Sequence, residues 1–211
     1  MNYNLIIFDF DGTLADTFPW FTSVINKVAD KYKFKKVSEN EHEILRGLSA
    51  REIFKYLGIP LWKTPMIGNY ISALLSKDIR KISLFNGIDS LLKLLSIKKV
   101  KIAILSSNSF INISKVLGSE NIVFIDYFEC GVPAFGKRAK LRKILKKSKI
   151  PPSEAIFIGD EIRDCEAANK EGIAFGAVSW GYTRMESLES CKPTEVFTSI
   201  DQISDKLLSS E

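Results

Sequence analysis

The sequence predicts an α/β protein in which a parallel sheet carries helices on both faces. Three observations predict this class: short apolar runs recur along the chain, helical periodicity separates them, and glycines stand where elements should end. The runs are continuous rather than alternating, as is typical of strands buried on both faces. They span residues 5–8, 101–105, 155–158 and 174–178, with a shorter run near 128–130.

The segments between these runs have the periodicity of amphipathic helices. They span residues 87–98, 108–117, 137–147 and 162–171. Gly118, Gly159 and Gly172 fall where helices or strands should end. Alternation of strand and helix argues for a parallel sheet, because parallel neighbours need a crossover connection.

The interval from residue 17 to residue 83 departs from this alternation, because it holds no run that predicts a strand. Its periodic segments predict helices over residues 18–32, 41–46, 51–57 and 63–81. We expect a Rossmann-like core of three layers, formed by residues 1–16 and 84–211. An all-α cap domain, residues 17–83, is inserted after the first strand and lies over its carboxyl end as a lid.

Composition narrows the class of protein. A hydrophobic content of 45% predicts a globular chain. The formal charge of +5 comes partly from eight basic residues in 137–149. Leu141, Ile144 and Leu145 give that tract helical spacing and no aromatics interleave, which favours a solvated helix face over a nucleic-acid site. Three scattered cysteines and no run of membrane length lead us to expect a cytoplasmic protein without membrane or nucleic-acid partners.

Polar side chains follow four of the predicted strands. Taken singly, Ser106 or Asp160 could cap a helix, and Lys137 could be one more solvated lysine. Taken together they should meet, because parallel strands bring their carboxyl ends to one edge of the sheet. The four groups are Asp9 with Asp11, Ser106 with Ser107 and Asn108, Lys137, and Asp160 with Asp164.

Such an edge would suit phosphoryl transfer. Asp9, Asp11 and Asp160 offer hard oxygen ligands of the kind that magnesium prefers. Ser106 and the amides after it can hold an oxyanion at a helix N-terminus, and Lys137 adds a charge that can pair with phosphate. Phosphoryl transfer needs little besides this neutralisation and in-line positioning.

These residues resemble the motifs of the haloacid dehalogenase superfamily, most of all its phosphoglycolate phosphatase-like members with a helical cap. The first motif, D-x-D-G-T, stands at residues 9–13. The second is a strand that ends at Ser106, the third is Lys137, and the fourth, G-D-x-x-x-D, stands at residues 159–164. Residues 178–182 are similar to the loop after the fifth strand of that group.

The resemblance implies a magnesium-dependent phosphatase that hydrolyses a small phosphorylated metabolite. Asp9 would be the nucleophile that forms an aspartyl-phosphate. Asp11 would protonate the leaving oxygen and then take a proton from the attacking water.

The same resemblance assigns ligands. Asp9, the backbone carbonyl of Asp11, and Asp160 would hold the magnesium ion, and Asp164 would steady those ligands from outside. The phosphoryl oxygens would be bound by Ser106, Lys137 and the amides near Ser107 and Asn108.

The residues leave alternatives open. A sugar phosphomutase keeps every motif, and a non-catalytic phospho-acceptor or scaffold is disfavoured only because no functional group is missing. A dehalogenase typically lacks the second aspartate, and a receiver domain lacks D-x-D-G-T and the helical insertion.

Lys140 competes with Lys137 for the third motif, because Arg138 stands where many relatives have proline. Arg46 and Arg51 could bind a substrate carboxylate or could be surface residues.

Overall fold

The computed structural model describes residues 3–131 and 136–208. A parallel sheet with the strand order β3-β2-β1-β4-β5-β6 lies at its centre. The order reverses direction at β1, so the carboxyl ends of β1 and β4 flank the crevice where open α/β sheets bind ligands. The strands are β1 (Leu5–Phe8), β2 (Lys101–Leu105), β3 (Tyr127–Glu129), β4 (Ala155–Gly159), β5 (Ala174–Val178) and β6 (Glu195–Phe197).

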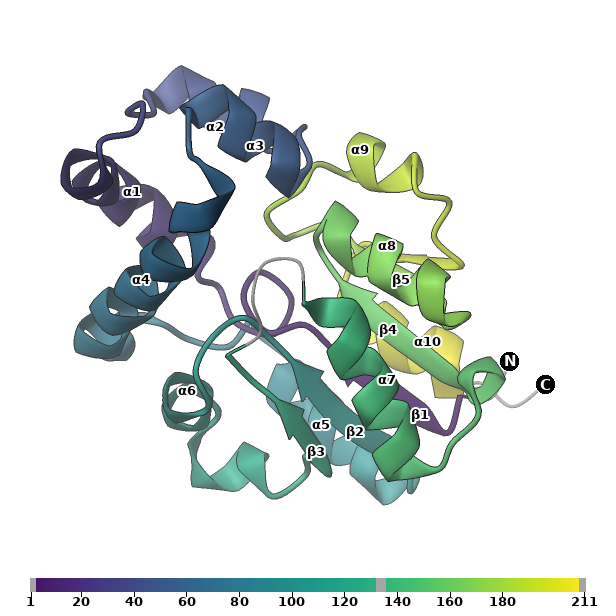
Figure 1. Ribbon diagram of the computed structural model, residues 1–211. Coiled ribbons are helices and arrows are strands. Elements are labelled where there is room, and N and C mark those ends of the chain that lie inside the picture. Colours follow the sequence, from purple (N-terminus) through teal and green to yellow (C-terminus); the bar gives the residue numbers. More distant parts are fainter. Residues whose placement is uncertain (1–2, 132–135, 209–211) are drawn as a thin grey trace.

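Helices cover both faces of the sheet and give the protein three layers (Figure 1). Ile6 and Phe8 of β1 belong to a hydrophobic cluster with α5, α6 and α10, whereas Leu5 and Ile7 belong to a second cluster with α7, α8 and α9. The split follows from the strand, whose successive side chains point to opposite faces. The predicted three-layer Rossmann-like α/β class is confirmed. These helices are α5 (Ile88–Ile97), α6 (Phe110–Ile122), α7 (Lys137–Ser148), α8 (Ile162–Glu171), α9 (Met185–Glu189) and α10 (Asp201–Leu208).

The insertion after β1 consists of helices that pack around a hydrophobic cluster of their own. Residues 17–83 are all described and contain no strand. Ile25, Leu57 and Ile67 belong to this cluster, whereas other apolar side chains of the insertion, such as Trp20 and Leu75, pack with the core cluster on one face of the sheet. We retain the division into a cap domain, 17–83, and a core domain as a prediction. The helices are α1 (Phe18–Tyr32), α2 (Glu39–Leu45), α3 (Ala50–Leu57), η1 (Leu61–Lys63), α4 (Thr64–Asp78) and η2 (Ile79–Lys81).

The insertion leaves and rejoins the core at one place. The Asp16 amide donates a hydrogen bond to the Ser83 carbonyl at 3.0 Å, and the Phe85 amide donates to the Leu14 carbonyl at 2.9 Å. Ala15 and Leu84 form an antiparallel bridge between them. The two connecting segments are therefore held together a few residues after β1.

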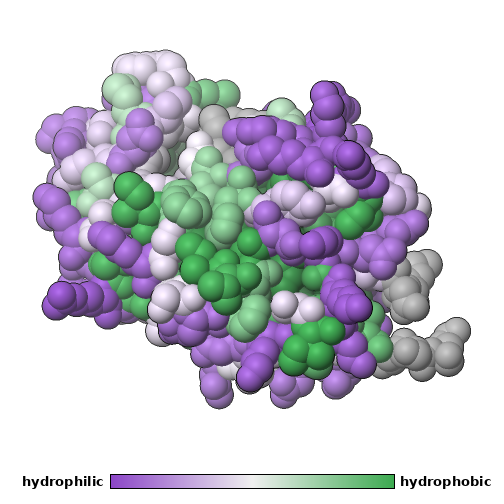
Figure 2. Space-filling view, turned by 90° about the horizontal axis from the view of Figure 1, so that it is seen from below, coloured by the Kyte–Doolittle hydropathy of each residue, from purple (hydrophilic) through white to green (hydrophobic). Residues whose placement is uncertain are grey.

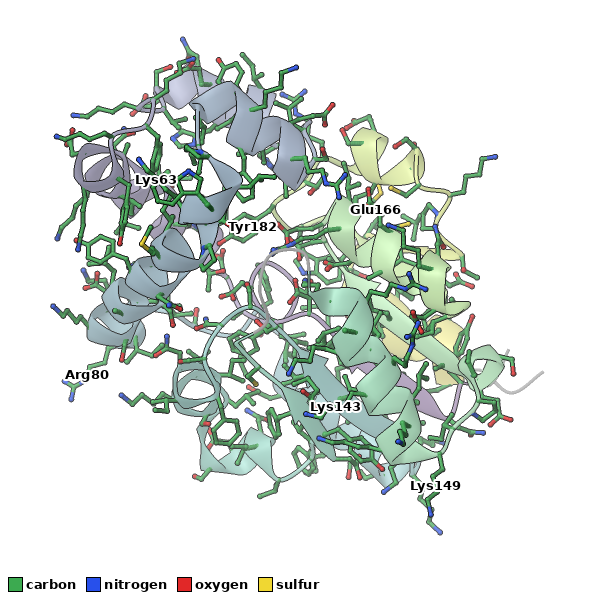
Figure 3. The ribbon with its side chains drawn as sticks, viewed as in Figure 1. Lys63, Arg80, Lys143, Lys149, Glu166 and Tyr182 are labelled. Carbon is green, nitrogen blue, oxygen red and sulfur yellow. The ribbon has the colours of Figure 1, made fainter. Side chains whose placement is uncertain are left out.

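Helix α7 carries most of the basic tract, and its side chains have acidic partners. Lys140, Lys143 and Lys147 all donate hydrogen bonds to the buried carboxylate of Glu129, at 2.8–3.1 Å. Figure 3 shows Lys143 in place on this helix. Burial by itself would raise the pKa of Glu129, but the three lysines lower it to about 2. The basic face of α7, which was predicted to be solvated, is thus also paired with acidic side chains.

The face seen in Figure 2 carries hydrophobic side chains gathered between hydrophilic ones. Helix α6, in the lower part of Figure 1, contributes exposed apolar residues such as Phe110 and Ile111. None of the helices in the described part of the chain combines the length and the apolar character that crossing a bilayer requires.

Candidate active site

Three buried carboxylates meet at the carboxyl edge of the sheet. Asp9 follows β1, Asp160 follows β4, and Asp164 lies in the first turn of α8. Each offers one oxygen, and these oxygens lie within 4.8 Å of one another. The exposed fractions of the three residues are 2% or less. The structure thus brings together residues that stand 151 positions apart in the sequence (9 to 160).

Lys137 occupies the same cluster from the first turn of α7. Its Nζ donates a hydrogen bond to Asp9 Oδ2 at 2.7 Å and another to Asp164 Oδ1. Burial alone would lower the pKa of Lys137, but the Asp164 and Asp9 carboxylates raise it above its usual value, so the side chain stays charged. Lys140, the competing lysine, instead binds Glu129.

Asp160 is held by two donors that fix both of its oxygens. Thr13 Oγ donates to Oδ1 at 2.7 Å, and the Tyr182 amide donates to Oδ2 at 2.7 Å. Thr13 belongs to the first motif, but sequence reasoning gave Tyr182 no role. The signal that could have found Tyr182 was its place in the loop after the fifth strand, next to Gly181.

Asp11 lies apart from the three carboxylates and faces the end of β2. The Asn108 side-chain amide donates to Asp11 Oδ1 at 3.2 Å, and Ser106 Oγ lies 3.5 Å from Oδ2. Burial and then the nearby charge of Asp9 raise the pKa of Asp11 to about 7. A carboxyl with such a pKa can both give and take a proton near neutrality.

Ser106 and the residues after it form a turn that opens toward the cavity. The Asn108 amide donates to Ser106 Oγ at 3.0 Å, and both residues are buried. Ser107, between them, is exposed and lines the cavity above Asp11. Of the predicted phosphoryl-binding residues, Ser106 and Asn108 therefore contact Asp11, whereas Lys137 contacts Asp9 and Asp164 in the carboxylate cluster.

The insertion contacts the loop that holds Asp160. Arg46 donates from Nε to the Tyr182 carbonyl and from Nη2 to the Gly181 carbonyl, both at 3.1 Å. The Tyr182 hydroxyl lies 3.0 Å from Thr17 Oγ, and Figure 3 places Tyr182 between the insertion and the core. Arg46 thus joins the two parts through main-chain carbonyls, and Arg51 is exposed on α3.

The carboxylate cluster suits a divalent cation. Burial comes first among the causes that raise the pKa of Asp160 and that of Asp164, the latter to about 7, with repulsion from neighbouring carboxylates added. A cation among three such oxygens would favour their ionised forms, and carboxylate oxygens are the ligands that hard divalent ions take. Among the described residues, Lys137 is the only positively charged side chain that contacts Asp9.

Comparison with known proteins agrees with this geometry. The model of a family described as haloacid dehalogenase-like hydrolase matches residues 6–178, which include most of β1, all of β2 to β5 and the whole insertion. The chain belongs to the haloacid dehalogenase-like hydrolase family. The protein is therefore a hydrolase by family.

Relatives of this hydrolase include proteins with different activities. The chain is 31% identical to a phosphoglycolate phosphatase of Synechococcus elongatus over 189 residues, which cover 89% of each protein. It is 25% identical over 211 residues to the tyrosine-protein kinase PtkA of Mycobacterium tuberculosis, covering 96% of the chain and 72% of that relative. A crystal structure described as a predicted phosphatase from Clostridium acetobutylicum shares the fold, with a TM-score of 0.82 at 20% identity over 99% of both chains.

Proposed function

We propose that this hydrolase is a magnesium-dependent phosphatase that cleaves a small phosphomonoester through an aspartyl-phosphate on Asp9. The observation that carries the proposal is the convergence of Asp9, Asp160 and Asp164 within 4.8 Å, with Lys137 bound to Asp9. The relative from Synechococcus elongatus, a phosphoglycolate phosphatase, supports the reaction class.

Asp9 would attack phosphorus. Its Oδ1 accepts a hydrogen bond from the Phe10 amide at 2.8 Å, and its Oδ2 accepts one from Lys137. These two contacts fix the carboxylate at the end of β1, and the lysine charge can also pair with an incoming phosphoryl group. Ser106 and Asn108, on the other side of Asp11, offer a hydroxyl and an amide to the phosphoryl oxygens.

Asp11 would move the protons. Burial raises its pKa, which favours the protonated form that can donate to the leaving alcohol oxygen. The resulting carboxylate can then accept a proton from the water that hydrolyses the phosphoenzyme. The products are an alcohol and inorganic phosphate, and Asp9 is regenerated.

Magnesium would be held by Asp9 and Asp160, with Asp164 supporting them through its contact with Lys137. When bound, the ion would offset the negative charge of the nucleophile and of the phosphate that it attacks. The Thr13 and Tyr182 donors keep Asp160 oriented for this task.

Phosphate release from p-nitrophenyl phosphate tests the proposal. We expect release with magnesium and none after chelation, and we expect Asp9→Asn to lower the rate by more than about 10³-fold while the fold persists. Asp11→Asn should leave phosphate covalently bound to the peptide that contains Asp9. Release that persists without any divalent ion, or in Asp9→Asn, would contradict the mechanism.

A further inference from the structure

A cavity of about 480 Å³ joins the candidate site to the interior of the helical insertion. Its inner end is lined by Asp9, Asp11 and Asn108. We call its outer part the cap chamber, which lies between helices α1, α3 and α4. Apolar side chains form the walls of the cap chamber, among them Phe21, Ile25, Phe54, Ile67, Ile71 and Leu75.

The positive charges on the lining of this cavity already have partners. Arg46 donates to two main-chain carbonyls and to Glu43, and Arg163 is paired with Glu161. Among the described residues of the lining, His42 of α2 is the remaining basic side chain, and there is no lysine. Both arginines that an anionic group of a substrate could meet on this lining therefore already have acidic partners.

The apolar walls of the cap chamber should bind two kinds of leaving group with different affinity. An apolar group in the cap chamber replaces water along apolar walls, and each methylene that it buries favours binding by about fourfold. A carboxylate in the same place loses its hydration without gaining a cation, which disfavours it. The phosphate end is served in both cases by the polar inner end of the cavity.

We propose that the cap chamber holds the organic part of the substrate and that this part is apolar and uncharged. The favoured substrates are then phosphomonoesters of aromatic or medium-length aliphatic alcohols, in preference to short phosphorylated hydroxy acids. This inference rests on the proposed phosphatase function, since it names the alcohol that hydrolysis releases. Water supplies the hydroxyl of the phosphate, and the alcohol oxygen takes its proton from Asp11.

A substrate series tests the inference directly. We would measure kcat/KM with saturating magnesium for ethyl, butyl and hexyl phosphate, and for phosphoglycolate as the anionic match of ethyl phosphate. We expect kcat/KM to rise by about fourfold per buried methylene until the chamber is full. We also expect phosphoglycolate to be hydrolysed more slowly than ethyl phosphate. A flat or falling series, or a preference for phosphoglycolate, overturns the inference.

A variant that narrows the cap chamber tests whether this chamber causes the preference for longer alkyl phosphates. Gly68 lies on α4 and lines the cavity, and a side chain added there would meet no atom within 4 Å at its Cβ. Gly68→Leu should lower kcat/KM for hexyl phosphate on the order of tenfold and leave ethyl phosphate within about twofold. Ala73→Leu, on an exposed position of the same helix that does not line the cavity, is the matched control and should change neither value. Equal effects of the two variants would contradict the assigned chamber.

His42→Gln completes the test, because among the described lining residues His42 is the one basic side chain that could bind an anion without first losing a partner. We expect this variant to leave hexyl phosphate hydrolysis unchanged and phosphoglycolate hydrolysis slow. A large loss confined to phosphoglycolate would overturn the inference. Failure of every ester to release phosphate would instead refute the phosphatase function itself, so the two failures are distinguishable.

Discussion

Gly12→Ala should damage both stability and catalysis because of where its methyl group would fall. Gly12 has φ +80°, and a Cβ built there would lie 2.3 Å from Asp160 Oδ2 and 2.5 Å from Tyr182 Cδ2. Asp160 cannot retreat easily, since it is fully buried and held by hydrogen bonds to both oxygens. Gly172 offers a matched control, because it has φ +68° at the end of α8 and a Cβ there would meet nothing within 4 Å.

The magnitude follows from two separate costs. An alanine in the left-handed region costs about 1–2 kcal/mol, and both variants share this cost. Forcing a methyl group into a packed site costs about 1–3 kcal/mol more, and only Gly12→Ala carries that cost. We therefore expect the free energy of unfolding to fall by about 2–5 kcal/mol in Gly12→Ala and by about 1–2 kcal/mol in Gly172→Ala.

Urea unfolding measures the first effect, and phosphate release from p-nitrophenyl phosphate measures the second. Displacing Asp160 by about 1 Å should lower kcat on the order of 10²-fold in Gly12→Ala, whereas Gly172→Ala should keep its rate. The reasoning is refuted if the two variants lose the same stability and retain the same activity, because the contact with Asp160 would then have no cost.

Three further predictions concern charged side chains. Lys137→Ala should lower kcat at least about 10²-fold, whereas Lys140→Ala should leave it nearly unchanged because that lysine binds Glu129; the reverse ranking in a rate assay would contradict the site. Glu129→Gln should lower the free energy of unfolding at pH 7 by about 1–2 kcal/mol, after allowance for the partly exposed lysines. Because the folded pKa of Glu129 lies near 2 and its unfolded value is about 4.3, this contribution is present above about pH 5 and is lost as the pH falls toward 2. Urea midpoints of both proteins should therefore converge in acid, and a constant difference would be the contrary result. Arg46→Gln should weaken the hold of the insertion on the Gly181–Tyr182 carbonyls and raise the magnesium concentration needed for half-maximal rate; an unchanged magnesium dependence would show that this contact does not orient Asp160.

The central strands could be predicted from the sequence because each is a continuous buried apolar run. Residues 5–8, 101–105 and 174–178 were predicted with the bounds that the structure has, and the β3 prediction differs by one residue. Strand β6 was missed, because its two apolar residues, Val196 and Phe197, stand between Glu195 and Thr198. Strand β3 is equally short and lies at the other edge, but residues 122–128 before and within it are apolar apart from Asp126.

Helix ends were harder to predict because they depend on contacts as well as periodicity. The helix expected to end at Leu117 continues to Ile122, with Gly118 in a non-helical conformation at φ 72°. Gly118 marks a kink that separates two helical stretches. The sequence therefore located an interruption at this glycine correctly, but the helix does not end there.

The candidate site was predictable where the chemistry lies in short motifs. Asp9, Lys137 and Asp160 were named from spacing and order, and the structure places them together. The loop that holds Tyr182 could be singled out from the sequence, but its contact with Asp160 could not, because that contact comes from a backbone amide. Any residue has such an amide, so only the folded loop shows which one is used.

The paired segments around Ala15 and Leu84 give the architecture an engineering consequence. Both connections between the insertion and the sheet pass through this one short bridge. The whole insertion could therefore be replaced as a unit without changing the order of the strands. Transplanting a foreign helical bundle between Asp16 and Ser83 would then change what the protein accepts, provided that the new bundle supplies a donor to the Gly181 and Tyr182 carbonyls in place of Arg46. Such a junction would allow substrate selectivity to change independently of the reaction at the sheet edge.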